Sequence, residues 1–600
     1  MLFALLAACS DYEVTPKREE PAPPEDTSVT PPTCAEAGEP FTVPSSSTCL
    51  VVAEPGTFTP VVEWQWNSNA TYGGYDDIMS TPAAANVTDD DGDGDVDEDD
   101  VPDLAFTSFS GGAYTSAGTL TLVSGDGSGT WWSILDAGGY ALHSSGNPAI
   151  GDIDADGVPE VCTPGFGVGV VCVNPDGSFK WAGGTEVNGY GAPAFADLDQ
   201  DGQAEVIFGR QVLNSDGSVR WTGTGGYGAW LSFAVDLDGD ERLEVIAGNT
   251  AYRGNGITLW TSSAPDGWGA AGDFDLDGLP EIVHVSSATV YLTGGDGTIW
   301  WSASVPGGGG GPPTVADFDN DGYPEVGVAG AYYYTVFDTD GSVRWSAAVQ
   351  DWSSSVTGSS VFDFEGDGAS DVVYADEITL WVYDGATGAV KLQEDGHASG
   401  TIYEYPLILD VDRDGSTEIV LPSNNYAYSG YNGITVIGDA DDSWRPSRPV
   451  WNQFAYHITN VENDGGIPVT QAPNWATWNS FRAGGSDLGD STDLADLELG
   501  TPEVCTYRCE EGVVEVLVPV ENTGLAGTTE FEVAIYRGPN VEVLETVPSL
   551  QAGAGVYLGP YELTEARWGG GVRAVVDEPD AVEECDETDN DADLGEWPCP

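Results

Sequence analysis

Short apolar runs separated by glycine-rich turns alternate along most of this 600-residue chain. The runs that begin at residues 205, 244, 281 and 418 are rich in Val and Ile, which predicts buried strands because β-branched side chains fit a pleated sheet. No stretch shows a sustained helical period. With 80 Gly, 20 Trp and 25 Tyr, the composition adds turn formers and aromatic strand residues, and the chain is predicted to be all-β.

A second signal follows several of these apolar runs. It is a turn containing Asp-Gly and then a strand that ends in tryptophan, as in residues 174–181, 214–221, 294–301 and 338–345. The repeating unit is therefore a loop, a strand, a tight turn and a strand ending in tryptophan.

The loop before each apolar run carries the pattern D-x-D-x-D-G-x-x-E, whose starts are 37 to 47 residues apart, the period of a four-stranded blade. Glu241 replaces the glycine in one copy, and Glu365 replaces the second Asp in another, so these two are the doubtful sites. The carboxylates of the seven regular copies are Asp152, Asp154, Asp156 and Glu160; Asp197, Asp199, Asp201 and Glu205; Asp236, Asp238, Asp240 and Glu244; Asp273, Asp275, Asp277 and Glu281; Asp317, Asp319, Asp321 and Glu325; Asp363, Glu365, Asp367 and Asp371; and Asp410, Asp412, Asp414 and Glu418.

An eighth, irregular copy lies in residues 89–106 and can be read in two registers. One keeps the repeat spacing with Asp95, Asp97, Asp99 and Asp103. The other fits a twelve-residue loop of the EF-hand type, in which Gly94 is the bend and the ligand positions are Asp89, Asp91, Asp93, Asp95, Asp97 and Asp100. The stretch therefore holds two ions, or one in either register.

Carboxylates on alternate residues of a tight loop can converge on one point, and four of them would repel one another without a cation. Ca²⁺ takes six to eight oxygen ligands, whereas Mg²⁺ prefers few protein ligands and retained waters, so the pattern predicts about one Ca²⁺ for each repeat. The alternative is that these are solvated acidic turns. A single copy leaves that reading open, while eight copies, each directly before a strand, argue against it.

These residues resemble the FG-GAP/VCBS-type repeats of integrin α-chain β-propellers and their bacterial relatives, over about residues 55 to 440. The resemblance implies a blade for each repeat, eight in all or seven if the irregular copy lies in a connecting loop. It also implies that the carboxylates named above, with the backbone carbonyl of the seventh loop residue, bind Ca²⁺. The propeller is assigned to residues 49–440, and the apolar run at 58–66 is expected to close the ring against the last blade.

Two further regions follow the repeats. Residues 441–490 are rich in Trp and Asn and are assigned as a connecting segment; Trp451, Asn452, His457 and Asn460 could form a polar pocket there, although packing against the propeller is favoured. Residues 491–600 resemble a CARDB-type, cell-adhesion-related domain with an immunoglobulin-like β-sandwich, through the V-x-N-x-G run at 520–524 and the acidic stretch at 584–590.

The N-terminus predicts export. Residues 1–9 end in a lipobox-like Leu-Ala-Ala-Cys, although no basic segment precedes it, so Cys9 is expected to carry a lipid anchor that directs the chain to the outer membrane or cell surface, and residues 10–48 form a Pro/Glu/Thr-rich tether. Disulfides are expected among eight cysteines: Cys34 with Cys49, Cys162 with Cys172, and unassigned pairs within Cys505, Cys509, Cys585 and Cys599. A zinc site built from the last four is the competing interpretation.

The formal net charge of −82 excludes nucleic acid as a partner, and it also fits a saline habitat. Of the catalytic signatures, H-E-x-x-H, G-x-S-x-G and a phosphate loop with lysine do not occur; His143, His284, His397 and His457 are scattered, and the three lysines are Lys17, Lys180 and Lys391. Some polysaccharide lyases of uronic-acid polymers resemble an eight-bladed calcium propeller, but such a site normally needs cationic groups. Aromatic residues at 225–230 and 330–337 either stack on sugars or wedge between blades.

We therefore expect a calcium-stabilised, surface-anchored adhesion or recognition protein without catalytic activity, with a surface protein or a glycan as its partner. A polysaccharide lyase and a purely structural component of the cell envelope are the alternatives. The function rests on family resemblance more than on a recognised site.

Overall fold

The computed structural model describes residues 40–43, 58–90, 96–97, 100–440, 443–485 and, with short gaps, 495–599. It contains two compact units: residues 51–493 form the first, and residues 1–50 together with 494–600 form the second. Strands dominate both units, as the apolar patterning predicts. In these described ranges no helix combines the length and the apolar character that crossing a membrane requires.

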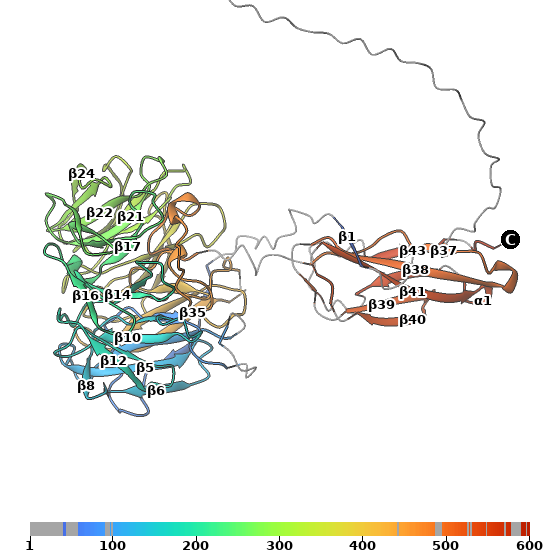
Figure 1. The fold of residues 1–600 in the computed structure, drawn as a ribbon, viewed down its shortest axis with the longest axis horizontal. Coiled ribbons are helices and arrows are strands. Elements are labelled where there is room, and N and C mark those ends of the chain that lie inside the picture. The colour runs from blue at the N-terminus through green and yellow to red at the C-terminus, as the bar shows by residue number, and fades with distance from the viewer. Residues whose placement is uncertain are drawn as a thin grey trace, which may run out of the picture. The chain divides into compact units, whose positions relative to one another are not determined.

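The first unit contains eight antiparallel sheets that follow one another along the chain, and Figure 1 shows them in colours that run from blue through green to orange. We number them as blades 1 to 8 of a β-propeller, which confirms the predicted fold class. Their strands are β3 (Ala83–Ala85), β4 (Asp103–Ser108), β5 (Ala117–Ser124) and β6 (Thr130–Ile134), with β7 (Asp136–Ala137) and β8 (Tyr140–His143) attached, in blade 1; β9 (Ala149–Gly151), β10 (Glu160–Pro164), β11 (Val170–Val173) and β12 (Phe179–Gly183) in blade 2; β13 (Ala194–Ala196), β14 (Glu205–Phe208), β15 (Gln211–Leu213) and β16 (Val219–Thr222) in blade 3; β17 (Phe233–Val235), β18 (Glu244–Ala247), β19 (Thr250–Arg253) and β20 (Thr258–Thr261) in blade 4.

The remaining blades follow the same plan. Their strands are β21 (Trp268–Gly272), β22 (Glu281–Ser286), β23 (Thr289–Thr293) and β24 (Ile299–Ser304) in blade 5; β25 (Thr314–Ala316), β26 (Glu325–Ala329), β27 (Tyr333–Phe337) and β28 (Val343–Ala348) in blade 6; β29 (Ser360–Phe362), β30 (Asp371–Ala375), β31 (Leu380–Tyr383) and β32 (Val390–Glu394) in blade 7; and β33 (Leu407–Leu409), β34 (Glu418–Ser423), β35 (Gly433–Asp439) and β2 (Pro60–Trp66) in blade 8.

The first strands face the middle of the ring, because first strands of most neighbouring blades contact one another, as β3 does with β9 and β21 with β25. The second strand is the apolar run of the repeat and is fully buried, as in β14 and β18. The acidic loop joins these two strands, so every copy of the loop lies at the same edge of its blade. Burial of the two inner strands therefore fixes where the carboxylates stand.

The ring closes between distant parts of the sequence. Strand β2 pairs antiparallel with β35, with Trp66 opposite Ile434, and supplies the fourth strand of blade 8. This confirms the closing strand predicted at residues 58–66. Closure pairs a sheet edge that would otherwise be exposed.

A tryptophan on the fourth strand holds a blade to the next in every blade except blade 7, which has Leu392. The indole Nε1–H groups of five of these residues donate to backbone carbonyls of the following blade at 2.6–2.9 Å, namely those of Trp132, Trp221, Trp260, Trp301 and Trp345. The ring of the tryptophan also covers the turn glycine of that next blade. At Gly217, where φ is +80°, an added Cβ would lie 2.5 Å from the Trp181 side chain. We call these residues the latch tryptophans, and they explain the second signal in the repeat.

Residues 443–485, which we call the central segment, lie along the first strands of many blades. Isolated bridges pair Trp451 with Ala84 in blade 1 and Phe481 with Val315 in blade 6. The Ile150 N–H of blade 2 donates to the Asn452 carbonyl at 2.8 Å. The segment, with the short 3-10 turns η2 (Ile458–Asn460) and η3 (Asn474–Ala476), therefore belongs to the propeller unit instead of leading out of it as the assigned connecting segment would.

Arg482 anchors the end of the central segment. It is fully buried, and its guanidinium donates to the carbonyls of Pro313 and of Gly269, the latter at 3.3 Å. The same group lies 5.1 and 5.0 Å from the ring centres of Phe454 and Phe481. Arg482 is therefore held by backbone carbonyls of the propeller and by aromatic rings of the central segment.

The second unit is a sandwich of two antiparallel sheets with one apolar core, which includes Val516, Val518, Phe531 and Ile535. One sheet contains β1 (Pro40–Thr42), β36 (Leu497–Leu499), β37 (Glu503–Cys505), β38 (Val513–Asn522) and β41 (Ala554–Thr564); the other contains β39 (Phe531–Arg537), β40 (Asn540–Val547), β42 (Val572–Val576) and β43 (Asp591–Asp593). The short elements η4 (Cys509–Glu511) and α1 (Glu565–Trp568) complete this unit, and η1 (Gly228–Trp230) belongs to the first. Strand β1 comes from the stretch predicted as a tether, and Phe41 and its neighbours pair with β41 at the edge of the sheet.

The cysteines form bridges. Cys162 and Cys172 face each other on β10 and β11 and are disulfide-bonded, which confirms the predicted pair. Cys509 bonds to Cys599, and Cys505 is also disulfide-bonded, so the alternative of a zinc site made from four thiolates is wrong. The predictions for Cys9, Cys34, Cys49 and Cys585 lie outside the described residues.

Candidate metal centres

The loop of blade 2 shows how the repeat builds a site. Asp152 accepts hydrogen bonds from the backbone N–H groups of Asp156 and Gly157, at 3.1 and 2.9 Å, and so bends the loop around its own carboxylate. Gly157 has φ of +87°, a left-handed conformation that favours glycine. At the end of the loop, Glu160 Oε2 accepts from the Ile153 N–H at 3.2 Å. Carboxylate oxygens of Asp152, Asp154 and Glu160 consequently lie within 4.8 Å of one another.

Four further blades repeat this arrangement. In each, the first Asp, the second Asp and the final Glu of the motif place an oxygen within 4.8 Å of the others: Asp197, Asp199 and Glu205; Asp236, Asp238 and Glu244; Asp273, Asp275 and Glu281; Asp317, Asp319 and Glu325. The third Asp of the motif is absent from these five described groups. Its Oδ1 accepts a backbone N–H two residues later, as Asp201 does from Gln203 at 3.0 Å, so it stabilises the turn.

The two doubtful loops keep the same backbone. Glu241, which replaces the glycine, has φ of +66°, and its N–H donates to Asp236 at 2.9 Å. In blade 7, Asp363 accepts from the N–H groups of Asp367 and Gly368 at 3.1 and 2.9 Å, as its counterparts do. Both departures from the motif are therefore tolerated by the loop conformation.

The final Glu of each of these five loops is buried. Burial, followed by smaller effects of neighbours, raises the pKa of Glu160, Glu205 and Glu244 to about 7, and that of Glu281 and Glu325 to about 8. A raised pKa means that the anionic form is disfavoured where it stands. A cation placed among these oxygens would reverse that cost.

Several oxygens in these loops have no hydrogen-bond partner. They are Asp154 Oδ1, Asp319 Oδ1, Glu325 Oε1, Asp410 Oδ1 and Glu418 Oε1, all buried. Buried polar atoms are nearly always paired, so unpaired oxygens that converge in acidic loops have the chemistry of cation ligands. The donors are all hard oxygens, which suits Ca²⁺ better than softer metals.

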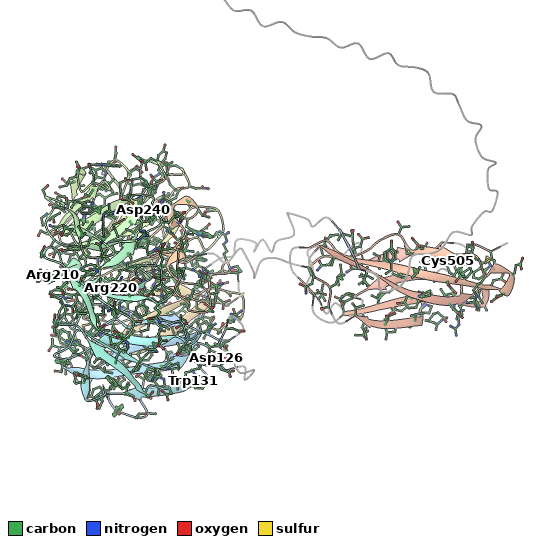
Figure 2. The ribbon with its side chains drawn as sticks, in the orientation of Figure 1. Asp126, Trp131, Arg210, Arg220, Asp240 and Cys505 are labelled. Atoms are coloured by element: carbon green, nitrogen blue, oxygen red, sulfur yellow. A yellow bond between two sulfur atoms is a disulfide. The ribbon has the colours of Figure 1, made fainter. Side chains whose placement is uncertain are left out.

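The sequence reasoning missed the basic side chains that reach into these loops. Lys180 Nζ lies 2.6 Å from Asp154 and 2.7 Å from Glu160. Arg220, labelled in Figure 2, pairs with Asp199 and Glu205 in the same way. The signal that could have found them is the residue before the latch tryptophan, which is Lys or Arg in several repeats.

The irregular first loop is only partly described. Asp91, Asp93, Asp95 and Asp99 lie outside the described residues, so neither register is tested. Asp89 and Asp97 are described but belong to none of the five groups above. Asp100 accepts the N–H groups of Asp90 and Asp97 at 2.9 and 3.0 Å.

Asp103 occupies the place of the final Glu in that loop. It accepts the Trp131 indole N–H at 2.5 Å and three donors from Val87 and Thr88, and burial raises its pKa to about 7. Its hydrogen-bond acceptors are thus used within the protein.

The four histidines are not arranged as a metal site. His143, His284, His397 and His457 are all buried, and burial lowers the pKa of each to about 4. The suggested polar pocket is also filled: Trp451, Asn452, His457 and Asn460 are buried within the central segment. Beside His457 and Phe481 remains a cavity of about 10 Å³, room for one water at most.

Two family models match this chain. Residues 273–328 match the FG-GAP-like repeat, and residues 494–593 match CARDB. The chain carries an FG-GAP-like repeat and a CARDB domain. The FG-GAP-like match begins at the first aspartate of the blade 5 loop and runs into blade 6, and the CARDB match covers the β-sandwich. Among proteins with curated descriptions, none matches this sequence.

Solved structures share the propeller fold. The crystal structure of the Vibrio cholerae biofilm matrix protein Bap1 aligns over 71% of this chain and 99% of its own, with 20% identity and a TM-score of 0.65. An exotype rhamnogalacturonan lyase, YesX, aligns over 64% of this chain and 75% of its own, with 16% identity and a TM-score of 0.44. A rhamnogalacturonan lyase from Bacillus licheniformis has the same coverage and identity and a TM-score of 0.42. At 20% identity the likeness to Bap1 concerns the fold alone.

Proposed function

We propose that this chain is a calcium-stabilised adhesion or matrix protein of the cell surface, without catalytic activity. The observation that carries the proposal is the set of carboxylate groups in blades 2 to 6, each held within 4.8 Å at the same edge of its blade. Bound Ca²⁺ would neutralise the clustered carboxylates and tie the start of the second strand to the loop before it. The protein's own contribution is to bend each loop by hydrogen bonds to its first Asp.

The comparison with Bap1 supports a role in adhesion. That protein is described as a biofilm matrix protein, and its whole length aligns with this chain. A CARDB domain beside an FG-GAP-like propeller fits the same role. A rigid ring with a separate sandwich offers broad surfaces for binding a surface protein or a glycan, while the carboxylate groups stabilise the ring.

Attachment to the membrane belongs to the same proposal. The lipobox-like Leu-Ala-Ala-Cys places the anchor on Cys9, and residues 10–39 would let the folded units stand away from the membrane. Metabolic labelling with a palmitate analogue tests this. Label incorporated into the full chain and lost in Cys9→Ala supports the anchor, and equal labelling of both chains contradicts it.

The test of function is a screen of the chain without residues 1–9 against glycan arrays and surface-protein arrays. The screen is run once with CaCl₂ at about the millimolar concentration found outside cells and once with EDTA. Binding that requires Ca²⁺, with no unsaturated uronate absorbance from pectin-like polymers, is the expected result. Unsaturated uronate absorbance from these polymers would instead establish a lyase. No binding to either array, with a changed envelope after gene deletion, would establish a purely structural component.

A further inference from the structure

The acidic loops differ in the side chain that faces them from the fourth strand. In blades 2, 3 and 6 the residue before the latch tryptophan is Lys180, Arg220 or Arg344. In blade 7, Lys391 holds the same place before Leu392. Strands alternate their side chains, so this residue and the tryptophan point to opposite faces of the strand, one toward the loop and the other toward the next blade.

These four cations contact the carboxylates that would bind metal. Lys391 Nζ lies 2.7 Å from both Glu365 and Asp371, and it is more than four-fifths buried. Arg344 pairs with Asp319 and lies 4.0 Å from Glu325. With Lys180 and Arg220 placed in the same way, the four loops have a built-in positive charge between the second and last ligand positions.

The loops of blades 5 and 8 have no such cation among the described residues. The equivalent positions are Trp300 in blade 5 and Glu63 in blade 8. In blade 8, Asp410 Oδ1 and Glu418 Oε1 are buried without a hydrogen-bond partner, and Glu418 is fully buried. Blade 6 also leaves two carboxylate oxygens unpaired, Asp319 Oδ1 and Glu325 Oε1, but Arg344 lies beside them. Blade 8 therefore differs in having no lysine or arginine at this position to offset its buried carboxylates.

The blade 5 loop opens into a hollow. The space has a volume of about 440 Å³ and is lined by Asp277, Glu281, Asp296 and Trp300 among others. No ion pair holds the Asp273, Asp275 or Glu281 carboxylates within the part of the chain that the structure describes. This loop therefore has room for a hydrated cation where blades 2, 3, 6 and 7 hold a lysine or arginine head group.

Blade 4 is intermediate. Leu259 precedes its latch tryptophan, and Arg253 reaches Asp238 and Glu244 from the third strand instead, at 3.5 and 3.9 Å. The Arg253 side chain is 43% exposed, so it is held less tightly than Lys180 or Lys391.

We propose that the residue before the latch tryptophan sets the calcium affinity of its loop, so that the ring has two classes of site. The loops of blades 5 and 8 bind Ca²⁺ tightly because nothing else neutralises their carboxylates. In blades 2, 3, 6 and 7, the lysine or arginine side chain repels Ca²⁺ and already pairs with the carboxylates that would bind it. Ca²⁺ must therefore displace that side chain or bind beside it. We expect a difference in affinity of about tenfold or more between the classes. The inference rests on the proposed calcium role.

The test is calcium titration of the full folded chain by isothermal calorimetry, with bound calcium counted by elemental analysis after dialysis at low free Ca²⁺. The wild type should retain at least two tight ions and bind the others about tenfold or more weakly. Trp300→Arg should lose one tight ion, whereas the matched control Trp300→Leu should keep it. Arg220→Met should gain one tight ion, and Arg220→Lys should not.

The possible results distinguish failure of the two affinity classes from failure of the proposed calcium role. Calcium binding with a single affinity, or an unchanged count in Trp300→Arg and Arg220→Met, overturns the two classes and leaves the calcium role standing. No bound calcium in folded wild-type protein overturns both. Circular dichroism at saturating Ca²⁺ confirms that each variant is folded, and because Trp300 is 46% exposed its replacement should not disturb the core.

Discussion

The propeller and the sandwich use different means to hold strands together. The sandwich has one core between two sheets and a disulfide from Cys509 to Cys599 that spans 90 residues. The propeller depends on small elements repeated around the ring: an acidic loop and a buried second strand in each blade, and a latch tryptophan in every blade except blade 7, which has Leu392. Repeated local sites can thus replace one large core, but the stability of the propeller then depends on the solution conditions that affect each site.

The largest expected difference between the two units is in how calcium removal affects their stability. If each loop binds with a Kd of about 0.1 mM, a few millimolar Ca²⁺ contributes about 2 kcal/mol for each site, or about 10 kcal/mol for five sites. EDTA should therefore lower the melting temperature of the propeller by tens of degrees and leave the sandwich unchanged. Calorimetry with and without EDTA measures both transitions, and a shift of one or two degrees in the propeller would refute a structural role for the ion.

Loss of the disulfide should destabilise the sandwich instead of the propeller. Removing a bridge that closes a loop of 90 residues, by Cys509→Ser with Cys599→Ser, is expected to destabilise the sandwich by about 4 to 5 kcal/mol, since the unfolded chain gains entropy. The propeller transition should stay where it was. Urea unfolding followed separately for the two units checks this, and an equal loss in both would mean that they unfold together.

The turn glycines should be the next most sensitive positions in the propeller. Gly217→Ala adds a Cβ about 2.5 Å from Trp181 on a residue with φ of +80°, and we expect a loss of about 2 to 3 kcal/mol. Gly139→Ala is the matched control, because it has a similar φ of +85° but open space around the added atom and lies outside the acidic loops. Equal losses in the two variants would show that backbone strain alone, and not the latch contact, determines the cost.

The smallest expected effect isolates the latch hydrogen bond. Trp301→Phe removes the indole N–H that donates to the Thr339 carbonyl at 2.9 Å while keeping an aromatic ring over Gly341, so the expected cost is about 1 kcal/mol. Trp300→Phe, one residue earlier and exposed, should cost almost nothing. Chemical denaturation in saturating Ca²⁺ compares the two, and a loss at Trp300 equal to that at Trp301 would argue against a latch.

Much of this fold could be predicted because its signals are local. The ligands of one loop lie within nine residues, so the spacing of Asp152, Asp154 and Glu160 already brings them close once a glycine bends the chain. The same holds for Cys162 and Cys172, which stand opposite each other across a short hairpin. The closing strand at residues 58–66 was identifiable because a ring needs one strand from its far end.

Other features depended on the register of separate strands. Lys180 meets Glu160 only because β11 and β12 return the chain to the loop, and nothing in a single repeat states that the residue before tryptophan will face the carboxylates. The sequence alone therefore did not show that Trp300 in blade 5 and Glu63 in blade 8 stand where other blades place a lysine or arginine beside the acidic loop. The strand β1 was missed for the same reason, since its partner β41 lies more than 500 residues away.

The sequence by itself determined an all-β chain of acidic repeats, the positions of the loops and one disulfide, because each follows from residues close together along the chain. Only the tertiary structure decided the path of the central segment, the burial of Arg482 among Phe454 and Phe481, and the pairing of basic side chains with particular loops. The physical reason is that these contacts join residues far apart in sequence, and they exist only when closure of the ring has brought their blades together.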